Sequence, residues 1–422
     1  MTRWLAVLLL PGLVIAQEDM WDDEDWDDEE DRQVWSGFIE AGAGSRLSED
    51  SLLATRGTLR ELRGRIETEW QPGGPTVHLK ADLGYDDIED DLIADFRDLS
   101  LAFNIGDSID ARLGRQVQTW GTGDLVFLND LFPKDFQSFF AGRDDEYLKA
   151  PGDAVRLTRY GNALNVDFVW TPVFEPNVYL TGERFSFFSP LAGDNVAPDP
   201  PLSADRPDKD FGNGEFALRL FSTVKGREYA IYAYRGYFKD PNGLDENLQP
   251  VFAPMSALGA SLRQPIGPGL FNAEFSYYDS RYDRSGTDPL TPNDQLRLLA
   301  GYEWEARPSF TVGLQYYLEW TLDHDELVAN SPLPQYEPDE HRHLLTNRLT
   351  YRAGMDKYTW SLFTFWSPSD ADVYLRPKFT YRYSDEWSFV VGGNLFGGSD
   401  DHTFFGQLED GTNIYLRLRF SY

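Results

Sequence analysis

Alternation of apolar and polar side chains constrains the fold of this chain more than any other feature of its sequence. In residues 413–422 apolar side chains occupy every second position, and Arg417 and Arg419 lie between them. Residues 310–322 and 373–383 repeat the pattern, with aromatic side chains near the ends of the apolar face. A period of two predicts β-strands that have one face in an apolar environment. We therefore expect an all-β fold.

The same reading along the chain predicts eighteen strands, with sixteen as the alternative count. Gly, Pro, Asn and Asp mark tight turns between alternate pairs of strands, for example at 71–75, 225–227 and 354–357. The intervening connections are mostly long, as at 119–153, 173–213 and 323–342. The predicted strands cover 34–44, 58–70, 76–85, 95–105, 109–118, 154–160, 164–172, 214–224, 228–239, 256–263, 269–280, 295–306, 310–322, 343–353, 358–366, 372–383, 387–396 and 413–422.

Composition narrows the fold class further. The 422 residues are 41% hydrophobic and 15% aromatic, which opposes intrinsic disorder of the whole chain. Beyond residue 16 no apolar run approaches the roughly 18 residues of a spanning helix. Long two-faced strands with short turns at one end and long loops at the other are typical of a transmembrane antiparallel up-and-down β-barrel. We expect short periplasmic turns, long extracellular loops and a location in the bacterial outer membrane.

The N-terminal residues carry two further predictions. Residues 1–16 have a basic start, a short apolar stretch and a small-residue end, which predicts a secretory signal peptide. Residues 17–33 form an acidic leader that is expected to be disordered, with 11 acidic side chains in the 14 residues 18–31. The plain interpretation is a solvated segment; the alternatives are a segment held in a basic cavity or one that docks a periplasmic partner. The barrel itself is expected over 34–422.

The polar faces of the strands predict the chemistry of the lumen. If the apolar faces point to lipid, many of the scarce cations point inward, and closure of the barrel makes the last strand a neighbour of the first. Such a basic stripe favours anions or an acidic plug, although inward charges can also be solvated filler. The predicted pore-lining basic residues are Arg63, Arg65, Arg348, Arg352, Arg376, Lys378, Arg382, Arg417 and Arg419.

The connection 119–153 is unusually apolar for a solvent-exposed loop, and it is also rich in acids. We expect it to fold into the lumen and to set its carboxylates against the basic stripe. Its predicted constriction-loop acids are Asp124, Asp130, Asp135, Asp144, Asp145 and Glu146.

With this loop the chain resembles Gram-negative outer-membrane porins, whose third loop enters the lumen. It is also similar to a little-characterised group of proteobacterial porin-like proteins that share Arg115-Gln116, Trp120-Gly121, Gly123-Asp124, and Asp130 through Pro133 with Asp135. In that group, neighbouring genes often encode transporters of the resistance-nodulation-division type, so the likeness implies export or lipid traffic. The porin likeness also implies a homotrimer surrounded by outer-membrane lipid.

The leading hypothesis for function is a channel for small hydrophilic, anionic solutes. The alternative is an outer-membrane component of an envelope export or lipid-transfer assembly with a plugged barrel, docked through the leader. Catalysis has no candidate residues, because His341 and His343 lie in a charged predicted loop and no nucleophile or phosphate motif occurs. No cofactor and no metal site are expected. A formal charge of −32 opposes nucleic-acid binding.

Overall fold

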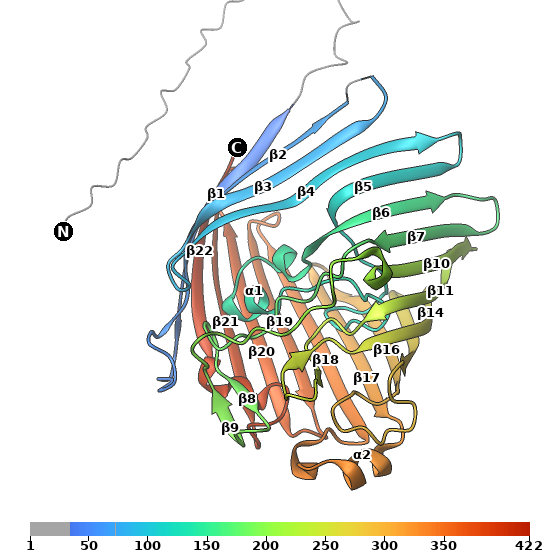
Figure 1. Cartoon of the computed structure of the whole chain (residues 1–422). Coiled ribbons are helices and arrows are strands. Elements are labelled where there is room, and N and C mark those ends of the chain that lie inside the picture. Colours follow the sequence, from blue (N-terminus) through green and yellow to red (C-terminus); the bar gives the residue numbers. More distant parts are fainter. Residues whose placement is uncertain (1–33, 72) are drawn as a thin grey trace, which may run out of the picture. The chain divides into compact units, whose positions relative to one another are not determined.

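The wall of the molecule is one closed antiparallel sheet. The computed structural model describes residues 34–71 and 73–422, so the predicted signal peptide and acidic leader lie outside it. Eighteen strands pair in chain order, and β1 (Trp35–Arg46) closes the barrel by pairing with both β2 (Gly57–Trp70) and β22 (Asn413–Ser421) (Figure 1). The other wall strands are β3 (Thr76–Asp86), β4 (Asp91–Ile105), β5 (Ile109–Val117), β6 (Pro151–Arg159), β7 (Asn165–Thr171), β10 (Glu215–Val224), β11 (Arg227–Tyr237), β14 (Pro254–Ile266), β15 (Gly269–Ser280), β16 (Gln295–Arg307), β17 (Phe310–Thr321), β18 (His341–Ala353), β19 (Tyr358–Ser367), β20 (Asp372–Arg382) and β21 (Trp387–Gly398).

Each of the eighteen predicted ranges coincides with one wall strand, so the fold class is confirmed. The main differences are at strand ends. β4 begins at Asp91 rather than at residue 95, because Asp91 pairs with Asp86 at the end of β3. The acidic run 86–91 is therefore a tight turn at a water-facing end of the barrel and not a long loop. β6 likewise begins at Pro151, which pairs with Val117.

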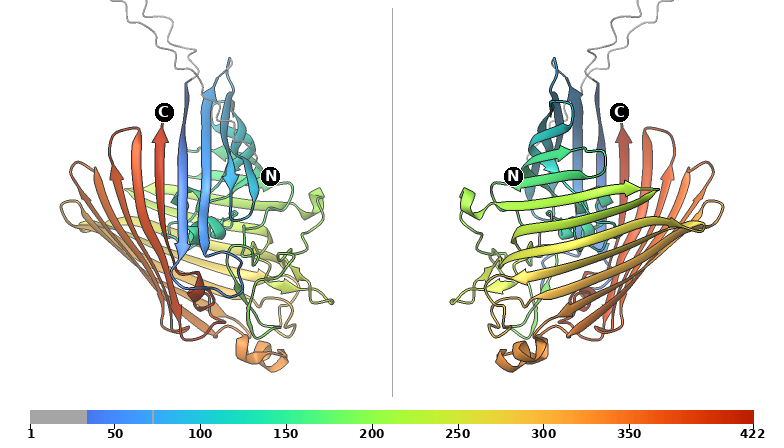
Figure 2. Two further views of the ribbon diagram at one scale, coloured as in Figure 1. Left: turned by 90° about the vertical axis from the view of Figure 1, so that its left-hand side faces the viewer. Right: turned by 90° about the vertical axis from the view of Figure 1, so that its right-hand side faces the viewer.

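The connections alternate in length as the sequence predicts. Short turns join the strands at one end, and Lys225 and Gly226 take the positive φ angles that such a turn requires. Long connections occur mainly at the other end, and Figure 2 shows α2 there, opposite the C-terminus. The long connections hold α1 (Phe136–Ala141), α2 (His324–Asn330), four short 3-10 helices (Asp145–Leu148, Phe211–Asn213, Pro334–Tyr336, Gly406–Gly411) and two small strand pairs, β8 (Phe187–Ser189) with β9 (Asp194–Val196) and β12 (Gly243–Leu244) with β13 (Pro250–Val251).

The outer face of the wall is apolar and carries aromatic side chains towards both ends. Near the short turns, Tyr351 stacks on Trp360 with ring centroids 5.6 Å apart, and Trp360 lies 5.1 Å from Phe379. Towards the long connections, Trp320 and Trp366 are exposed on the same face. Aromatic girdles at two levels are typical of a barrel that spans a bilayer. Among the described residues, no helix is long and apolar enough to cross a membrane.

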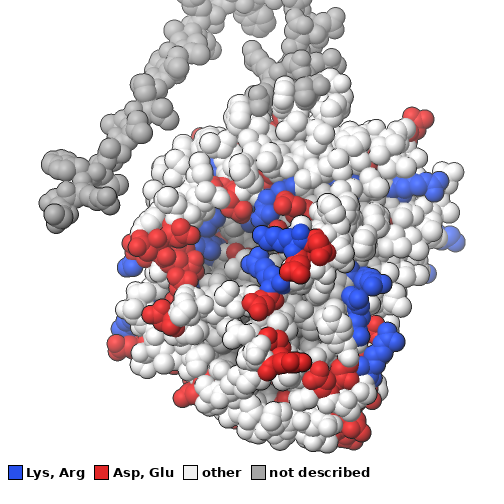
Figure 3. Space-filling model, in the orientation of Figure 1, with Lys and Arg blue, Asp and Glu red and all other residues white. Residues whose placement is uncertain are grey.

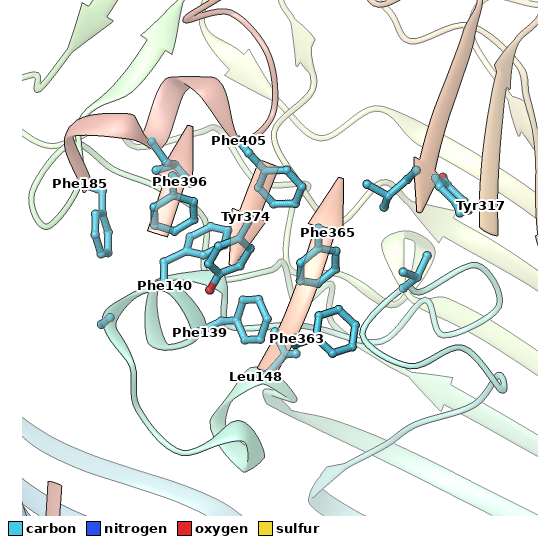
Figure 4. Close-up of a cluster of buried hydrophobic side chains, with 14 of the residues drawn as sticks. Phe139, Phe140, Leu148, Phe185, Tyr317, Phe363, Phe365, Tyr374, Phe396 and Phe405 are labelled. Carbon is cyan, nitrogen blue, oxygen red and sulfur yellow. The ribbon is translucent and has the colours of Figure 1, made fainter. Parts of the chain in front are cut away.

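The largest hydrophobic core lies inside the barrel. Phe139 and Phe140 of α1 pack against Tyr374, Phe365 and Phe396, which point inward from the wall (Figure 4). The Tyr374 and Phe396 rings are 4.3 Å apart, and Phe140 lies 5.5 Å from Phe396. Each such pair contributes about 0.5–1.5 kcal/mol beyond its buried area. Aromatic side chains therefore occupy part of the barrel interior.

Candidate functional site

The candidate site is the lumen together with the connection 118–150 between β5 and β6, which we call the inner loop. Two buried side chains hold its start. Gln116 donates from Nε2 to the carbonyls of Gly114 (3.2 Å) and Ala154 (3.3 Å), on its own strand and on β6. Trp120 donates from Nε1 to the carboxylate of Asp167 at 3.1 Å. The loop therefore leaves the wall in a fixed direction, towards the barrel interior.

The first half of the inner loop is held mainly by hydrogen bonds to inward side chains of β15 and β17. Glu274 accepts from the backbone N–H of Gly123 (2.8 Å) and from Nδ2 of Asn129 (2.7 Å). Gln315 both accepts from the backbone N–H of Asp124 (2.7 Å) and donates to its carbonyl (2.8 Å). A buried carboxylate that accepts several N–H groups is a strong anchor, because each bond is charge-assisted. One ion pair joins this half to β18, between Asp124 and Arg348 at 2.5 Å.

The short helix α1 lies at the middle of the inner loop. Asp135 caps its N-terminus by accepting from the backbone N–H of Ser138 at 2.7 Å. Gly142 ends it in the left-handed conformation, with φ of 89°. A Cβ at Gly142 would lie 2.2 Å from the ring of Tyr415, so only glycine fits between α1 and the wall. Asn394 also donates to the carbonyl of Phe140 at 2.8 Å.

The second half of the inner loop is held by ion pairs with β20 and β22. Asp145 accepts from Arg376 at 2.9 Å and from Lys378 at 2.5 Å. Asp144 lies 3.1 Å from Arg417. Arg376 also stacks on the ring of Phe139 with its guanidinium 3.8 Å from the centroid. Two consecutive loop carboxylates thus contact cations on two wall strands. We define these cations, Arg376, Lys378, Arg417 and Arg419, as the basic wall.

One further carboxylate completes this group. Glu40 of β1 is buried and lies 3.3 Å from Arg417 and 2.8 Å from Arg419. The four cations of the basic wall therefore share three carboxylates, Glu40, Asp144 and Asp145. Lys378 and Arg419 keep 25% and 21% of their side chains exposed, whereas Arg376 and Arg417 are buried. The group thus has one more cation than carboxylates, and two of its cations face the lumen.

A second ionic group continues from β2 to β4. Arg65 lies 2.6 Å from Asp82 on β3 and 2.6 Å from Glu146 of the inner loop. Tyr147 inserts its ring between these charges, accepts from Arg65 at 2.8 Å and donates to Asp82 at 2.6 Å. Arg63 pairs with Asp82 at 3.2 Å. Near the centre of the face drawn in Figure 3, cationic and acidic side chains lie side by side.

Protonation of the inner loop follows from these contacts. Burial alone would raise the pKa of Asp145, but Arg376 and Lys378 outweigh it and hold that pKa below its usual value. Arg417 and Arg419 likewise outweigh burial and lower the pKa of Asp144. Burial raises the pKa of Tyr147, which keeps its hydroxyl a neutral donor. Both loop carboxylates therefore stay ionised against the wall.

The remaining predicted residues have other places. Asp130 pairs with buried Lys134 at 3.0 Å within the loop, and Asp135 caps α1, so neither contacts the basic wall. Arg352 and Arg382 are exposed at the short-turn end of β18 and β20 and form no ion pair with a described residue. Of the predicted residues, the structure brings together Arg348 with Asp124, and separately Arg63, Arg65, Arg376, Lys378, Arg417 and Arg419 with Asp144, Asp145 and Glu146.

Several residues of the site are not among the predicted ones. Arg143 of the inner loop lies 2.8 Å from Glu61, and Arg97 donates to the loop carbonyls of Glu146 (2.9 Å) and Lys149 (2.8 Å). Arg97 escapes a period-two reading because the register shifts beside it, where Lys80 pairs with Asp98 and Ala81 with Phe96. Arg143 lies in an aperiodic segment. Glu40, by contrast, is signalled by alternation along β1.

The histidines are placed differently from the prediction. His341 and His343 begin β18 instead of lying in a loop. Their rings stack on aromatic side chains of β17, His341 on Trp320 at 5.1 Å and His343 on Tyr316 at 6.0 Å. Within the described part of the chain, no group of three or more His, Cys, Asp or Glu side chains could hold a metal ion.

Two cavities border the inner loop from opposite ends of the barrel. One of about 340 Å³ lies towards the long connections and is lined by residues of 125–140, by Lys239 and by Arg342. The other, of about 210 Å³, is lined by residues 122–124, by Arg348 and by Glu303 near the short turns. The loop therefore separates two spaces of the lumen, as a constriction would.

Comparison with known proteins gives the fold. No protein-family model and no curated protein matches the sequence. Similar solved structures include OccAB1 of Acinetobacter baumannii (TM-score 0.53, 10% identity, covering 92% of this chain and 96% of that chain), OccK5 (OpdH) of Pseudomonas aeruginosa (TM-score 0.53, 12% identity, 93% and 98%) and OccAB3 of Acinetobacter baumannii (TM-score 0.52, 12% identity, 92% and 98%). At such identities the likeness is one of fold. The chain thus has the eighteen-stranded fold of Gram-negative outer-membrane porins, and its apolar outer face places it in the outer membrane.

Proposed function

We propose that this barrel is a diffusion channel for small hydrophilic solutes, with a preference for anions. The observation that carries the proposal is the basic wall, where four cations share three carboxylates beside the inner loop. The group has one more cation than carboxylates, and Lys378 and Arg419 are the cations that remain partly exposed. Inside a low-dielectric wall, such a charge raises the local concentration of anions.

Single-channel recording in planar bilayers tests this function on the purified full chain. We expect a measurable conductance and a reversal potential in a KCl gradient that reports chloride preference. The double substitution Lys378→Glu with Arg419→Glu reverses two partly exposed charges, so the ratio of chloride to potassium permeability should fall several-fold. Arg227→Gln is the matched control, because Arg227 is exposed at a short turn after Gly226. Absence of conductance, or an unchanged permeability ratio in the double variant, contradicts the proposal.

A second candidate function rests on how firmly the inner loop is held. Its aromatic core and its two sets of anchors support a barrel that is plugged. In that case the protein serves as an outer-membrane component of an envelope export or lipid-transfer assembly, and the acidic segment 18–31 docks a periplasmic partner. Deletion of 18–31 separates the two functions: loss of a co-purifying partner favours the assembly, whereas a rise in conductance assigns the segment a plugging role in a channel.

Two further properties remain proposals with direct measurements. A signal peptide over 1–16 predicts that the mature chain begins at Gln17, which mass spectrometry of the membrane-purified protein reads out. A homotrimer, as the porin likeness implies, predicts three copies per detergent complex, which light scattering with detergent subtraction measures.

A further inference from the structure

The larger lumen cavity has an unusually aromatic lining. Its volume of about 340 Å³ falls within the range of sites for small molecules, which are mostly apolar with a few placed polar groups. Rings come from three separate parts of the chain: the inner loop, the wall, and the connection after β21 (Figure 4 labels five of them). They include Phe127, Phe136, Phe139 and Phe140 from the loop, Tyr278, Tyr317 and Phe365 from the wall, and Phe404 and Phe405 from the connection.

One polar group of this cavity lacks a partner. Arg342 at the start of β18 uses its Nε to donate to Asp370 at 2.5 Å, and its guanidinium lies 5.5 Å from the centroid of the Phe404 ring. Its Nη2 is buried and has no hydrogen-bond partner among the described residues. A buried donor without an acceptor costs roughly 1–3 kcal/mol, and a bound acceptor removes that cost. The same guanidinium therefore offers both an unsatisfied donor and a position next to an aromatic ring.

The other cations of the cavity are already compensated. Lys134 pairs with Asp130 at 3.0 Å, and Arg297 lies 3.3 Å from Glu319. Lys239 lies 2.6 Å from the carboxylate of Glu215. Because each cation has a carboxylate beside it, the cavity gives little advantage to an anionic ligand. Its polar side therefore matches a neutral acceptor better than an anion.

We propose that this cavity binds a small neutral aromatic molecule that carries one hydrogen-bond acceptor, with the acceptor on the guanidinium of Arg342, whose side chain is 18% exposed, and the ring among the aromatic side chains. The proposed ligand is a substrate class for the proposed channel. Its passage through the barrel rests on the proposed function, whereas its binding in the cavity does not. The aromatic lining selects a flat ring, because edge-to-face contacts add about 0.5–1.5 kcal/mol to simple apolar burial. The ligand would occupy the space on the long-connection side of the inner loop.

Isothermal titration calorimetry on the detergent-solubilised full chain tests the binding step, with benzamide as the probe. We expect saturable binding, weakened about threefold or more for cyclohexanecarboxamide, which keeps the acceptor and loses the flat ring. Arg342→Gln should weaken benzamide binding about tenfold, because the free guanidinium donor is lost. Phe404→Ala should abolish the difference between the two probes, which a general loosening of the barrel would not do. Arg227→Gln, at the other end of the barrel, should bind like the wild type.

The outcomes separate this inference from the proposed function. Absence of saturable benzamide binding, or equal affinity in wild type and Arg342→Gln, overturns the inference even when the barrel conducts ions. Benzamide binding with the expected variant effects supports the site even when planar-bilayer recording shows no conductance, and in that case the channel function fails alone. Tighter binding of benzoate than of benzamide also overturns the inference, because it requires an uncompensated cation in the cavity.

Discussion

The two halves of the inner loop are fixed in the lumen by different forces. The first half, around 122–129, is anchored mainly by hydrogen bonds to Glu274 and Gln315 on the wall. The second half, around 143–147, is anchored by ion pairs with the basic wall. In the first half a wall carboxylate, Glu274, accepts from neutral N–H groups, whereas in the second half the loop carboxylates pair with cations and depend on charge at both partners. The comparison identifies the second half as the part of the constriction that charge changes can release.

The largest effect should come from removing the two loop carboxylates. Asp144→Asn with Asp145→Asn leaves Arg376 and Arg417 buried without full compensation, and breaking a buried pair costs about 3–5 kcal/mol. Because both carboxylates are partly exposed, we expect about 3 kcal/mol less stability against local opening of 143–147. Hydrogen exchange of the loop amides in detergent measures this. Unchanged exchange in the second half, or equal loss in 122–129, contradicts the comparison.

A glycine substitution at the junction of the two halves comes next. Gly142→Ala places a Cβ against the ring of Tyr415 at a positive φ, so we expect about 2 kcal/mol of destabilisation of α1. Gly226→Ala is the matched control, because Gly226 also has a positive φ but no atom within 4 Å of an added Cβ. Protease sensitivity of the inner loop reads out the difference. Similar behaviour of both variants would mean that the cost of the substitution comes from backbone strain and not from contact with the wall.

Loss of the first anchor should cost less. Glu274→Gln keeps one acceptor oxygen and the side-chain shape but removes the charge from its hydrogen bonds to Gly123 and Asn129, for about 1–2 kcal/mol. Opening of 122–129, measured by hydrogen exchange, should rise while 143–147 stays protected. Raised salt should leave this effect unchanged. An equal rise of exchange in both halves would show that they are one cooperative unit and would contradict the comparison.

Lowering the pH from 7 to 4 should have the smallest effect on the anchoring of the inner loop. The pKa values of Asp144 and Asp145 are lowered in the folded protein, so their contribution is present above the usual aspartate value of 3.8 and is lost as the pH falls through the lowered values. Protection of the amides of 143–147 should therefore be constant from pH 7 to pH 4 and decrease only at more acidic pH. The double Asp→Asn variant should lack this acid transition. A transition centred between pH 5 and pH 6 in the wild type would exclude these two groups as its cause.

The wall of this protein is readable from its sequence because its signals are local. Each strand alternates between an apolar outer side and a polar inner side, so Leu416 and Arg417 report their faces without knowledge of the rest of the chain. Turn residues such as Gly226 mark the ends of hairpins. The exceptions have physical causes. The register shifts beside Arg97, and the pairing of β3 with β4 continues into water, where Asp86 ends one strand and Asp91 begins the next.

The candidate site is only partly readable. Alternation finds the inward cations Arg376 and Arg417, and the acidic composition of the inner loop finds Asp144 and Asp145. Neither signal reveals that Asp130 pairs with Lys134 inside the loop or that Asp135 caps α1. These roles depend on the path of an aperiodic segment, where neither helix nor strand spacing gives a direction to a side chain.

The sequence by itself determined the barrel and, apart from the shifted register of β4, the inward face of its strands. Only the tertiary structure decided which charges meet and how much of the lumen the inner loop fills. Asp145 and Arg376 lie 231 positions apart in the chain and come within 2.9 Å because the barrel closes and the loop crosses it. The physical reason is that a strand's faces follow from the geometry of neighbouring peptides, whereas an ion pair across a lumen depends on closure and on packing around Phe140 and Tyr374.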